Sequence, residues 1–203
     1  DFAFKEGYGV GAFNVNNKDQ LQAICDADAE TSSPVIAQVS SNALQYADKG
    51  LLAAMVSYMA EKKYPHIPIA LHLDHGPDIE TIKECVDLGI TSVMIDGSLD
   101  YSTKDEKGAH PVRSFDDNVA ITKEAVEIAH AAGVTVEGEI GTLGGVEDDT
   151  VAGDVHLTEP EEAEEFVKQT GIDALDIAVG TSHGAYKFPV GTEIKLALDI
   201  VNE

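Results

Sequence analysis

The feature that most constrains the fold of this chain is a regular alternation of short apolar runs with longer amphipathic runs. The short runs are rich in Val, Ile, Leu and Ala, as buried strands are, whereas the longer runs carry apolar residues at a helical period. We expect strands at residues 9–15, 34–40, 67–75, 91–96, 134–141 and 174–183. Six β-α units in succession predict a parallel sheet with helices outside it.

Polar residues stand where several of the intervening helices are expected to begin. Asp48 precedes one periodic run and can act as its N-cap, and Thr158-Glu159-Pro160-Glu161 has the pattern of a capping box. The helices are expected at residues 18–30, 78–88, 116–132 and 192–203, after Asp48, and after Thr158.

Two architectures fit such an alternation, a doubly wound sheet and a (β/α)8 TIM barrel. No G-x-G-x-x-G follows the first strand, which favours the barrel. Polar residues at the carboxyl ends of the strands favour it further, because barrel enzymes carry their active sites there. We therefore predict a single (β/α) barrel domain over residues 1–203, with about the first six units present and units seven and eight missing from this sequence.

Four potential metal ligands stand at the ends of consecutive strands. His75 ends the third strand, Asp96 the fourth, Glu139 the fifth and His183 the sixth. In a barrel these ends meet on one face. Two imidazoles and two carboxylates suit Zn²⁺ or a similar transition metal, so the sequence predicts a metal site built from separate strands.

The remaining histidines do not follow this pattern. His72 shares a strand face with Asp74, so we expect it to point into the barrel, where it can pack or orient Asp74. The others are expected at the surface; they are His66, His110, His130 and His156. Two long polar loops, at residues 97–114 and 142–157, interrupt the alternation, and we assign no role to the first.

Acidic residues dominate the composition: 37 Asp and Glu against 13 Lys and Arg give a formal net charge of −24. Nucleic-acid phosphates require a basic face, so we expect no nucleic-acid partner. An anionic substrate is repelled at long range, so a phosphate site must depend on a local Lys, a metal or backbone N–H groups. The acidity fits adaptation to high salt as well as it fits an ordinary acidic protein.

The apolar runs and the two cysteines bear on membrane association and on the redox compartment. No apolar run approaches the roughly 20 residues that span a bilayer, so we expect no membrane partner. Cys25 and Cys85 both fall within expected helices and lack metal-type spacing, which favours buried thiols in a reducing compartment. We therefore expect a cytoplasmic protein.

Six short motifs follow one another in the order in which a known enzyme family carries them. They are Gly-Val-Gly-Ala-Phe-Asn-Val at 9–15, Leu-His-Leu-Asp-His-Gly at 71–76, Ser-Val-Met-Ile-Asp-Gly at 92–97, Val-Glu-Gly-Glu-Ile-Gly at 136–141, Gly-Gly-Val-Glu-Asp at 144–148 and Gly-Thr-Ser-His-Gly-Ala-Tyr-Lys-Phe at 180–188. With these motifs the chain resembles the class II, metal-dependent fructose-bisphosphate aldolases over essentially its whole length. The resemblance implies a (β/α)8 barrel that reversibly cleaves fructose 1,6-bisphosphate to dihydroxyacetone phosphate and glyceraldehyde 3-phosphate.

The resemblance also implies the metals and their ligands. His75 and His183 resemble the ligands of the catalytic Zn²⁺, while Asp96 and Glu139 resemble ligands of a second metal position. The implied cofactors are Zn²⁺, together with a second divalent metal and a monovalent cation. The implied substrate is a phosphorylated sugar, and we expect a homo-oligomer, a dimer or a tetramer.

Two carboxylates resemble the family's proton-transfer groups. Asp74 resembles the residue that exchanges a proton with the aldehyde oxygen and the C4 hydroxyl, and Glu147 resembles the base that takes the proton from dihydroxyacetone phosphate. Glu147 follows Gly144-Gly145, which supplies the freedom for a lid to close and exclude water. Substrate-contacting positions are matched by Asn14 and Ser40, and the region that holds the ketone-side phosphate is matched by Gly184 and Lys187.

The family pattern has further motifs beyond the position that corresponds to residue 203. It has a third zinc histidine on the seventh strand, in a phosphate-binding loop, and a further motif on the eighth. We expect both to lie outside residues 1–203, and we expect the 203-residue polypeptide alone to be inactive.

Three other interpretations stay open at this point. A tagatose-1,6-bisphosphate aldolase uses the same chemistry on the epimeric sugar, and no residue separates the two. A non-catalytic barrel fragment with structural histidines belongs to another class, and metal content would distinguish it. A Schiff-base aldolase would use Lys187 as its nearest candidate nucleophile, and borohydride trapping would reveal it.

Overall fold

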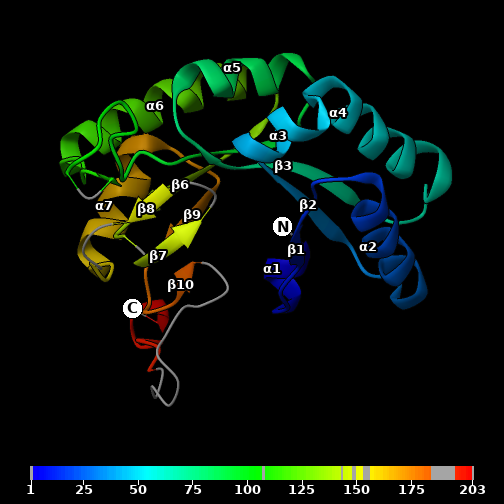
Figure 1. Ribbon diagram of the computed structural model, residues 1–203. Helices are drawn as coiled ribbons and strands as arrows, with labels where there is room; N and C mark the ends of the chain where they lie inside the picture. Colours follow the sequence, from blue (N-terminus) through cyan, green and yellow to red (C-terminus); the bar gives the residue numbers. More distant parts are fainter. Residues whose placement is uncertain are drawn as a thin grey trace.

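The computed structural model describes residues 2–106, 108–142, 144–147, 150–152, 156–183 and 195–202, with the backbone alone described at 144–147, 150–152 and 202. Six parallel strands form its central sheet and lie side by side in chain order. The strands are β1 (Gly11–Asn14), β2 (Val35–Ser40), β3 (Ile69–Gly76), β4 (Ser92–Ile95), β6 (Thr135–Ile140) and β9 (Ala174–Ile177). The sheet is curled like half of a barrel (Figure 1), which confirms the predicted parallel α/β architecture.

The helices that follow the strands arch over the outer, convex side of the sheet (Figure 1). They are α2 (Lys18–Thr31), α3 (Ser41–Ala47), α4 (Lys49–Tyr58) with a π-helical turn at Met59–Lys63, α5 (Ile79–Asp87), α6 (Phe115–Ala131) and α7 (Pro160–Thr170). Two shorter helical segments stand apart from this layer: α1 (Phe2–Glu6), which precedes β1, and a 3-10 turn at Ile200–Asn202. Within the described ranges, none of these helices combines the length and the apolar character that crossing a bilayer requires.

The main apolar core lies between the helices and the sheet. Leu21, Leu52 and Ile82 from three helices bury their side chains in one cluster with Val39 and Leu73 from two strands. Each such side chain contributes about 1.5–3 kcal/mol when it leaves water. Because the helices take up this face of the sheet, the alternate residues of the strands are left for the inner face, where the polar side chains gather.

Side-chain caps fix where several helices begin. Asn17 accepts hydrogen bonds from the backbone N–H groups of the first turn of α2, and Asp78 and Ser114 do the same for α5 and α6. Asp48 accepts from the Leu51 N–H at 3.1 Å and caps α4, as predicted. These bonds satisfy donors that the first turn of a helix cannot pair internally.

The predicted capping box at Thr158 is wrong. The Thr158 hydroxyl donates to the Ile140 carbonyl at 2.6 Å and accepts from the Ala178 N–H at 2.8 Å, and the Glu159 side chain makes no capping bond to α7. Thr158 is buried where β6 and β9 end, and its hydroxyl pairs with backbone groups at these strand ends. The local sequence favours a cap, but these hydrogen bonds to distant residues form in its place.

Several other boundaries also differ from the sequence prediction. The strand expected at 174–183 ends at Ile177, and β10 (Ser182–His183) belongs to a second, four-stranded sheet. That sheet also contains three strands from the expected loops: β5 (Ala109–His110), β7 (Gly144–Glu147) and β8 (Thr150–Ala152). The helix expected at 192–203 is wrong over the described residues, where only the 3-10 turn is helical. These segments take their structure from distant partners, which a local pattern does not reveal.

Strand β3 carries an extra residue opposite β4. Leu73 pairs with Val93 and Gly76 with Ile95, so β3 takes three steps where β4 takes two. Within this bulge His75 has φ of 46°, a left-handed conformation that costs a non-glycine residue about 1–3 kcal/mol. A bulge re-aims the side chains around it, and here it lies where β3 enters the candidate site.

Gly76 lets β3 and β4 approach each other directly after the bulge. A Cβ at this position would lie 2.6 Å from the Met94 carbonyl oxygen and 2.9 Å from Leu73 Cδ2. The Gly76 carbonyl in turn accepts a hydrogen bond from the Asp96 N–H at 3.0 Å. Glycine at this position therefore fixes the place where Asp96 leaves the sheet.

We predict that Gly76→Ala lowers the free energy of unfolding by about 1–3 kcal/mol, because a backbone oxygen cannot move aside as a flexible side chain can. Urea unfolding followed by circular dichroism measures this change. Gly50→Ala in α4 is the matched control: its Cβ would meet only Asp48 Oδ1 at 3.5 Å, and alanine favours a helix. Equal stabilities of the two variants would contradict the close approach.

Candidate metal centre

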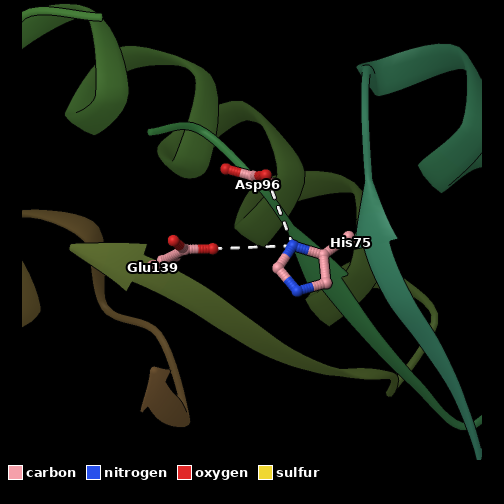
Figure 2. Close-up of side chains that lie close together, drawn as sticks. All are labelled: His75, Asp96 and Glu139. Carbon is pink, nitrogen blue, oxygen red and sulfur yellow. Dashed lines mark hydrogen bonds and ion pairs between the residues drawn. The ribbon is translucent and has the colours of Figure 1, made fainter. Parts of the chain in front are cut away.

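Three side chains from three neighbouring strands converge on one point. His75 comes from β3, Asp96 follows β4, and Glu139 comes from β6. His75 Nδ1 lies 3.3 Å from Asp96 Oδ2 and 3.6 Å from Glu139 Oε2, and Figure 2 shows both carboxylates directed at this one nitrogen. One ligand atom from each residue lies within 4.8 Å of the other two. The structure thus brings together three of the four predicted metal ligands.

His183, the fourth predicted ligand, lies beside this group. Its ring meets the His75 ring edge to face, with 5.1 Å between the ring centroids. It comes from β10 and not from the end of β9, so a return of the chain carries it to the site. The two imidazoles are therefore neighbours, as the sequence predicts.

Asp96 is almost completely buried and is held through both carboxylate oxygens. The Ser98 N–H and hydroxyl donate to Oδ1 at 3.1 and 2.7 Å. The Tyr101 hydroxyl donates to Oδ2, the oxygen that also faces His75. Such contacts behind a potential ligand fix its orientation before an ion arrives.

Glu139 has an oxygen that suits a cation. Its backbone carbonyl accepts from Asn118 Nδ2 at 2.8 Å, and its Oε1 lies 3.5 Å from the Ser98 hydroxyl. Oε2 is buried and has no hydrogen-bond partner among the described residues, although it faces His75. A buried carboxylate oxygen without a hydrogen bond is costly, and a metal ion at this point would satisfy it. The donor set, one imidazole and two carboxylates with a second imidazole beside them, fits a divalent transition metal.

The three groups change one another's affinity for protons. Burial by itself would lower the pKa of His75, but the hydrogen bond and charge of Asp96, with the charges of Glu139 and Asp74, raise that pKa to about 10. Burial would raise the pKa of Asp96, yet His75, Tyr101 and Ser98 hold it below its usual value. Burial and then the charge of Asp96 raise the pKa of Glu139. Without metal, a protonated imidazole therefore lies between the two acids.

A second polar layer lies next to the metal ligands on the inner face. His72 Nδ1 is 2.8 Å from the Ser92 hydroxyl, and His72 Nε2 is 3.3 Å from Glu137 Oε2. Burial lowers the pKa of His72, whereas burial, aided by the charges of Asp176 and Asp74, raises the pKa of Glu137 to about 7. These shifts favour the neutral forms of both side chains over a full ion pair. His72 is buried and contacts Glu137, so it points inward, as predicted.

Three predicted substrate or catalytic residues lie at the ends of β1, β2 and β3. Asp74 is buried, and its Oδ2 accepts from Asn14 Nδ2 at 3.4 Å. Ser40 lies opposite Asp74 in the register of β2 against β3. The Ser40 hydroxyl also accepts from the Ala43 N–H at 3.2 Å, which makes it the N-cap of α3. Ser40 therefore caps a helix at a position beside Asp74.

Other predicted residues fall elsewhere. Glu147 lies in β7, but its side chain is outside the described part of the chain, as are Gly184 and Lys187 altogether. His66, His130 and His156 are exposed, as predicted. The surface prediction for His110 is wrong, because the residue is 6% exposed and its Nδ1 donates to backbone carbonyls of its own loop.

Sequence reasoning missed three residues that act on the cluster. Ser98 and Tyr101 contact Asp96 from a loop with no periodic pattern, so no sequence signal pointed to them. Asp176 lies opposite Glu139 in the register of β6 against β9, and its charge raises the pKa of both Glu137 and Glu139. An acid in the middle of an apolar strand, Leu-Asp-Ile, was the signal that could have found it.

Known proteins are similar to this chain in sequence and fold. The family model for class-II fructose-bisphosphate aldolases matches residues 1–203. The fructose-bisphosphate aldolase of Giardia intestinalis is 52% identical over 199 residues, covering 98% of this chain and 57% of its own length. That of Treponema pallidum is 50% identical over 193 residues, covering 92% of this chain and 54% of its own length.

A solved structure is also similar to this fold. The crystal structure of the YdjI aldolase from Escherichia coli K12 matches with a TM-score of 0.76 at 32% identity, over 98% of this chain and 64% of that one. The chain spans about half the length of the curated relatives it matches.

The protonation state of His75 predicts that metal binding near pH 7 releases at least one proton per ion. Because the pKa is about 10 in the metal-free fold, the imidazole is doubly protonated at pH 7, and a ligand imidazole must give up a proton. The affinity for Zn²⁺ should accordingly rise with pH. Isothermal titration calorimetry in buffers of different ionisation enthalpy counts the protons.

His130→Gln is the control for this titration, because His130 is exposed, pairs with Asp173 at 2.9 Å, and lies outside the cluster. This variant should release as many protons as the parent. Metal binding by the parent without proton release would contradict the charge state inferred for His75.

Proposed function

The chain belongs to the class-II fructose-bisphosphate aldolase family, and from that premise we propose that the protein reversibly cleaves fructose 1,6-bisphosphate to dihydroxyacetone phosphate and glyceraldehyde 3-phosphate. The observation that carries the proposal is the convergence of His75, Asp96 and Glu139 at the carboxyl ends of β3, β4 and β6, with His183 beside them. This is the end of a parallel barrel at which active sites lie. We further propose that the six β-α units belong to a single barrel domain.

The chemistry explains why such residues are needed. Breaking a carbon–carbon bond next to a ketone leaves negative charge on the substrate, which must be delocalised onto oxygen. A bound divalent metal supplies the Lewis acid that stabilises this charge. In our proposal His75 and His183 hold a catalytic Zn²⁺, and Asp96 and Glu139 serve a second divalent position.

Asp74 is the proposed proton-transfer group at the C4 hydroxyl. It lies next to His75 in the chain, so its carboxylate enters the site from the same strand end. Asn14 donates to its Oδ2, which orients the carboxylate. A carboxylate held in this way can accept the hydroxyl proton as the bond breaks and return it in the reverse reaction.

The remaining roles come from the family resemblance. Glu147 is proposed to move the proton at dihydroxyacetone phosphate, and Gly184 and Lys187 are proposed to bind the ketone-side phosphate. A local cation such as Lys187 is needed because the chain carries a formal charge of −24, which repels a bisphosphate at a distance. We also propose a monovalent cation as a further cofactor, a homo-oligomeric assembly and a cytoplasmic location, the last supported by two buried free cysteines.

The test of the function is turnover of fructose 1,6-bisphosphate by the protein purified with its natural ends. We expect cleavage that a chelator abolishes and added Zn²⁺ restores, measured by a coupled assay for dihydroxyacetone phosphate. Tagatose 1,6-bisphosphate is the comparison substrate, and faster turnover of this epimer would assign the protein to the alternative aldolase. A metal-replete protein that cleaves neither sugar would contradict the proposal. Chelator-resistant cleavage that borohydride abolishes would instead indicate a Schiff base.

The role of Asp74 predicts that Asp74→Asn lowers kcat by about 100-fold or more, because the amide keeps the shape but cannot accept the proton. Metal content of the variant should match that of the parent. Asp116→Asn is the matched control, since Asp116 is exposed in the first turn of α6 and is not one of the site residues described above. An Asp74→Asn variant with the parent's kcat would remove Asp74 from the mechanism.

A further inference from the structure

The loop at residues 97–114 reaches the metal centre through one aromatic side chain. Tyr101 lies on this loop and donates a hydrogen bond from its hydroxyl to Asp96 Oδ2. We propose that Tyr101 is a positioning residue, whose hydroxyl holds the Asp96 carboxylate in the orientation in which it binds a divalent cation. The proposal rests on the metal centre proposed above but not on which bisphosphate the protein cleaves.

The contacts of Asp96 explain why its orientation needs a second support. Ser98 holds only Oδ1, through its N–H at 3.1 Å and its hydroxyl at 2.7 Å. A carboxylate that is hydrogen-bonded at only one oxygen can still rotate, and this rotation moves its other oxygen. Oδ2 is the oxygen that faces His75 and the centre of the cluster, and the Tyr101 hydroxyl is bonded to this same atom. The two contacts together fix the plane of the carboxylate.

The hydrogen bond from Tyr101 is compatible with metal binding at the same oxygen. A carboxylate oxygen carries two lone pairs, so Oδ2 can accept the hydroxyl with one and offer the other to a cation. Contacts of this kind behind a metal ligand commonly change metal affinity by about 10- to 100-fold when they are removed. Tyr101 is therefore placed to act through Asp96 without touching the ion.

The loop holds Tyr101 firmly enough for this role. The Tyr101 ring lies against the ring of His110, with centroids 4.8 Å apart. His110 is buried, and its Nδ1 donates to the carbonyls of Asp100 and Thr103 at 3.2 and 2.8 Å. Arg113, the only arginine of the chain, donates to the Leu99 carbonyl from the far end of the loop. These contacts close the loop on both sides of Tyr101.

The competing explanation is that Tyr101 serves only to fasten the loop to the sheet. A fastening role would lower the stability of the metal-free protein, whereas a positioning role would lower metal affinity at unchanged stability. Tyr101→Phe separates the two, because it removes the hydroxyl and keeps the ring that packs on His110.

The experiment titrates metal-free protein with Co²⁺, using the visible absorption of the bound ion and competition with a chelator to obtain the dissociation constant. We expect Tyr101→Phe to bind Co²⁺ about 10-fold more weakly or worse and to show an altered absorption band. Its thermal unfolding midpoint without metal should equal that of the parent. Ser98→Ala, which removes the hydroxyl bond to Oδ1 and keeps the bond from the backbone N–H, should also weaken Co²⁺ binding.

Tyr46→Phe is the matched control, because the Tyr46 side chain is 79% exposed on α3 and should leave affinity and spectrum unchanged. Parent-like Co²⁺ affinity and spectrum in Tyr101→Phe would overturn the proposal, and so would a weaker affinity accompanied by a lower unfolding midpoint. A parent protein that binds no Co²⁺ would overturn the metal centre itself. That failure is distinguishable, since it is seen before any variant is compared.

Discussion

The extra residue in β3 is the constraint on which the site depends. Strict alternation along a strand would place His72 and His75, three residues apart, on opposite faces of the sheet. The bulge opposite β4 and the left-handed backbone at His75 change this, so that both rings reach inner-face carboxylates: His72 contacts Glu137, and His75 contacts Asp96 and Glu139. Gly76 then restores close pairing with β4 immediately afterwards. The bulge and the left-handed backbone at His75 thus bring the titratable groups together on the inner face of the sheet.

Two buried carboxylates come together at this point, and hydrogen bonds from the protein stabilise only part of their negative charge. Asp96 receives donors on both oxygens, but Glu139 Oε2 is buried without a hydrogen bond among the described residues. In the metal-free fold the protonated His75 compensates the two acids, which is why its pKa rises to about 10 despite burial. A divalent ion supplies the same positive charge more fully. The site is therefore arranged to exchange protons for metal.

The two long polar segments of the sequence have become structural parts of the site. The loop at 97–114 contributes Ser98 and Tyr101 to Asp96, and the segment after β6 contributes β7, which pairs with the β10 strand that carries His183. Both segments lie at the carboxyl ends of the strands, where barrel loops meet. In this fold the loops complete a ligand set that the strands begin.

The sequence by itself determined the order of strands and helices, the parallel sheet and the strand ends at which His75, Asp96 and Glu139 stand. These follow from periodicity and from strand polarity, which are properties of short segments. It also pointed to the metal chemistry, since the residue types at those ends are metal ligands.

The tertiary structure alone decided the rest. Thr158 pairs with strand-end backbone in place of capping α7, His110 is buried beneath Tyr101, and His183 stands on a strand of the second sheet. The contact of Tyr101 with Asp96 and the position of Asp176 opposite Glu139 are likewise decided in three dimensions. Each of these depends on which distant groups are left unpaired once the sheet has curled, and a hydrogen bond or charge between distant segments leaves no periodic trace in the chain.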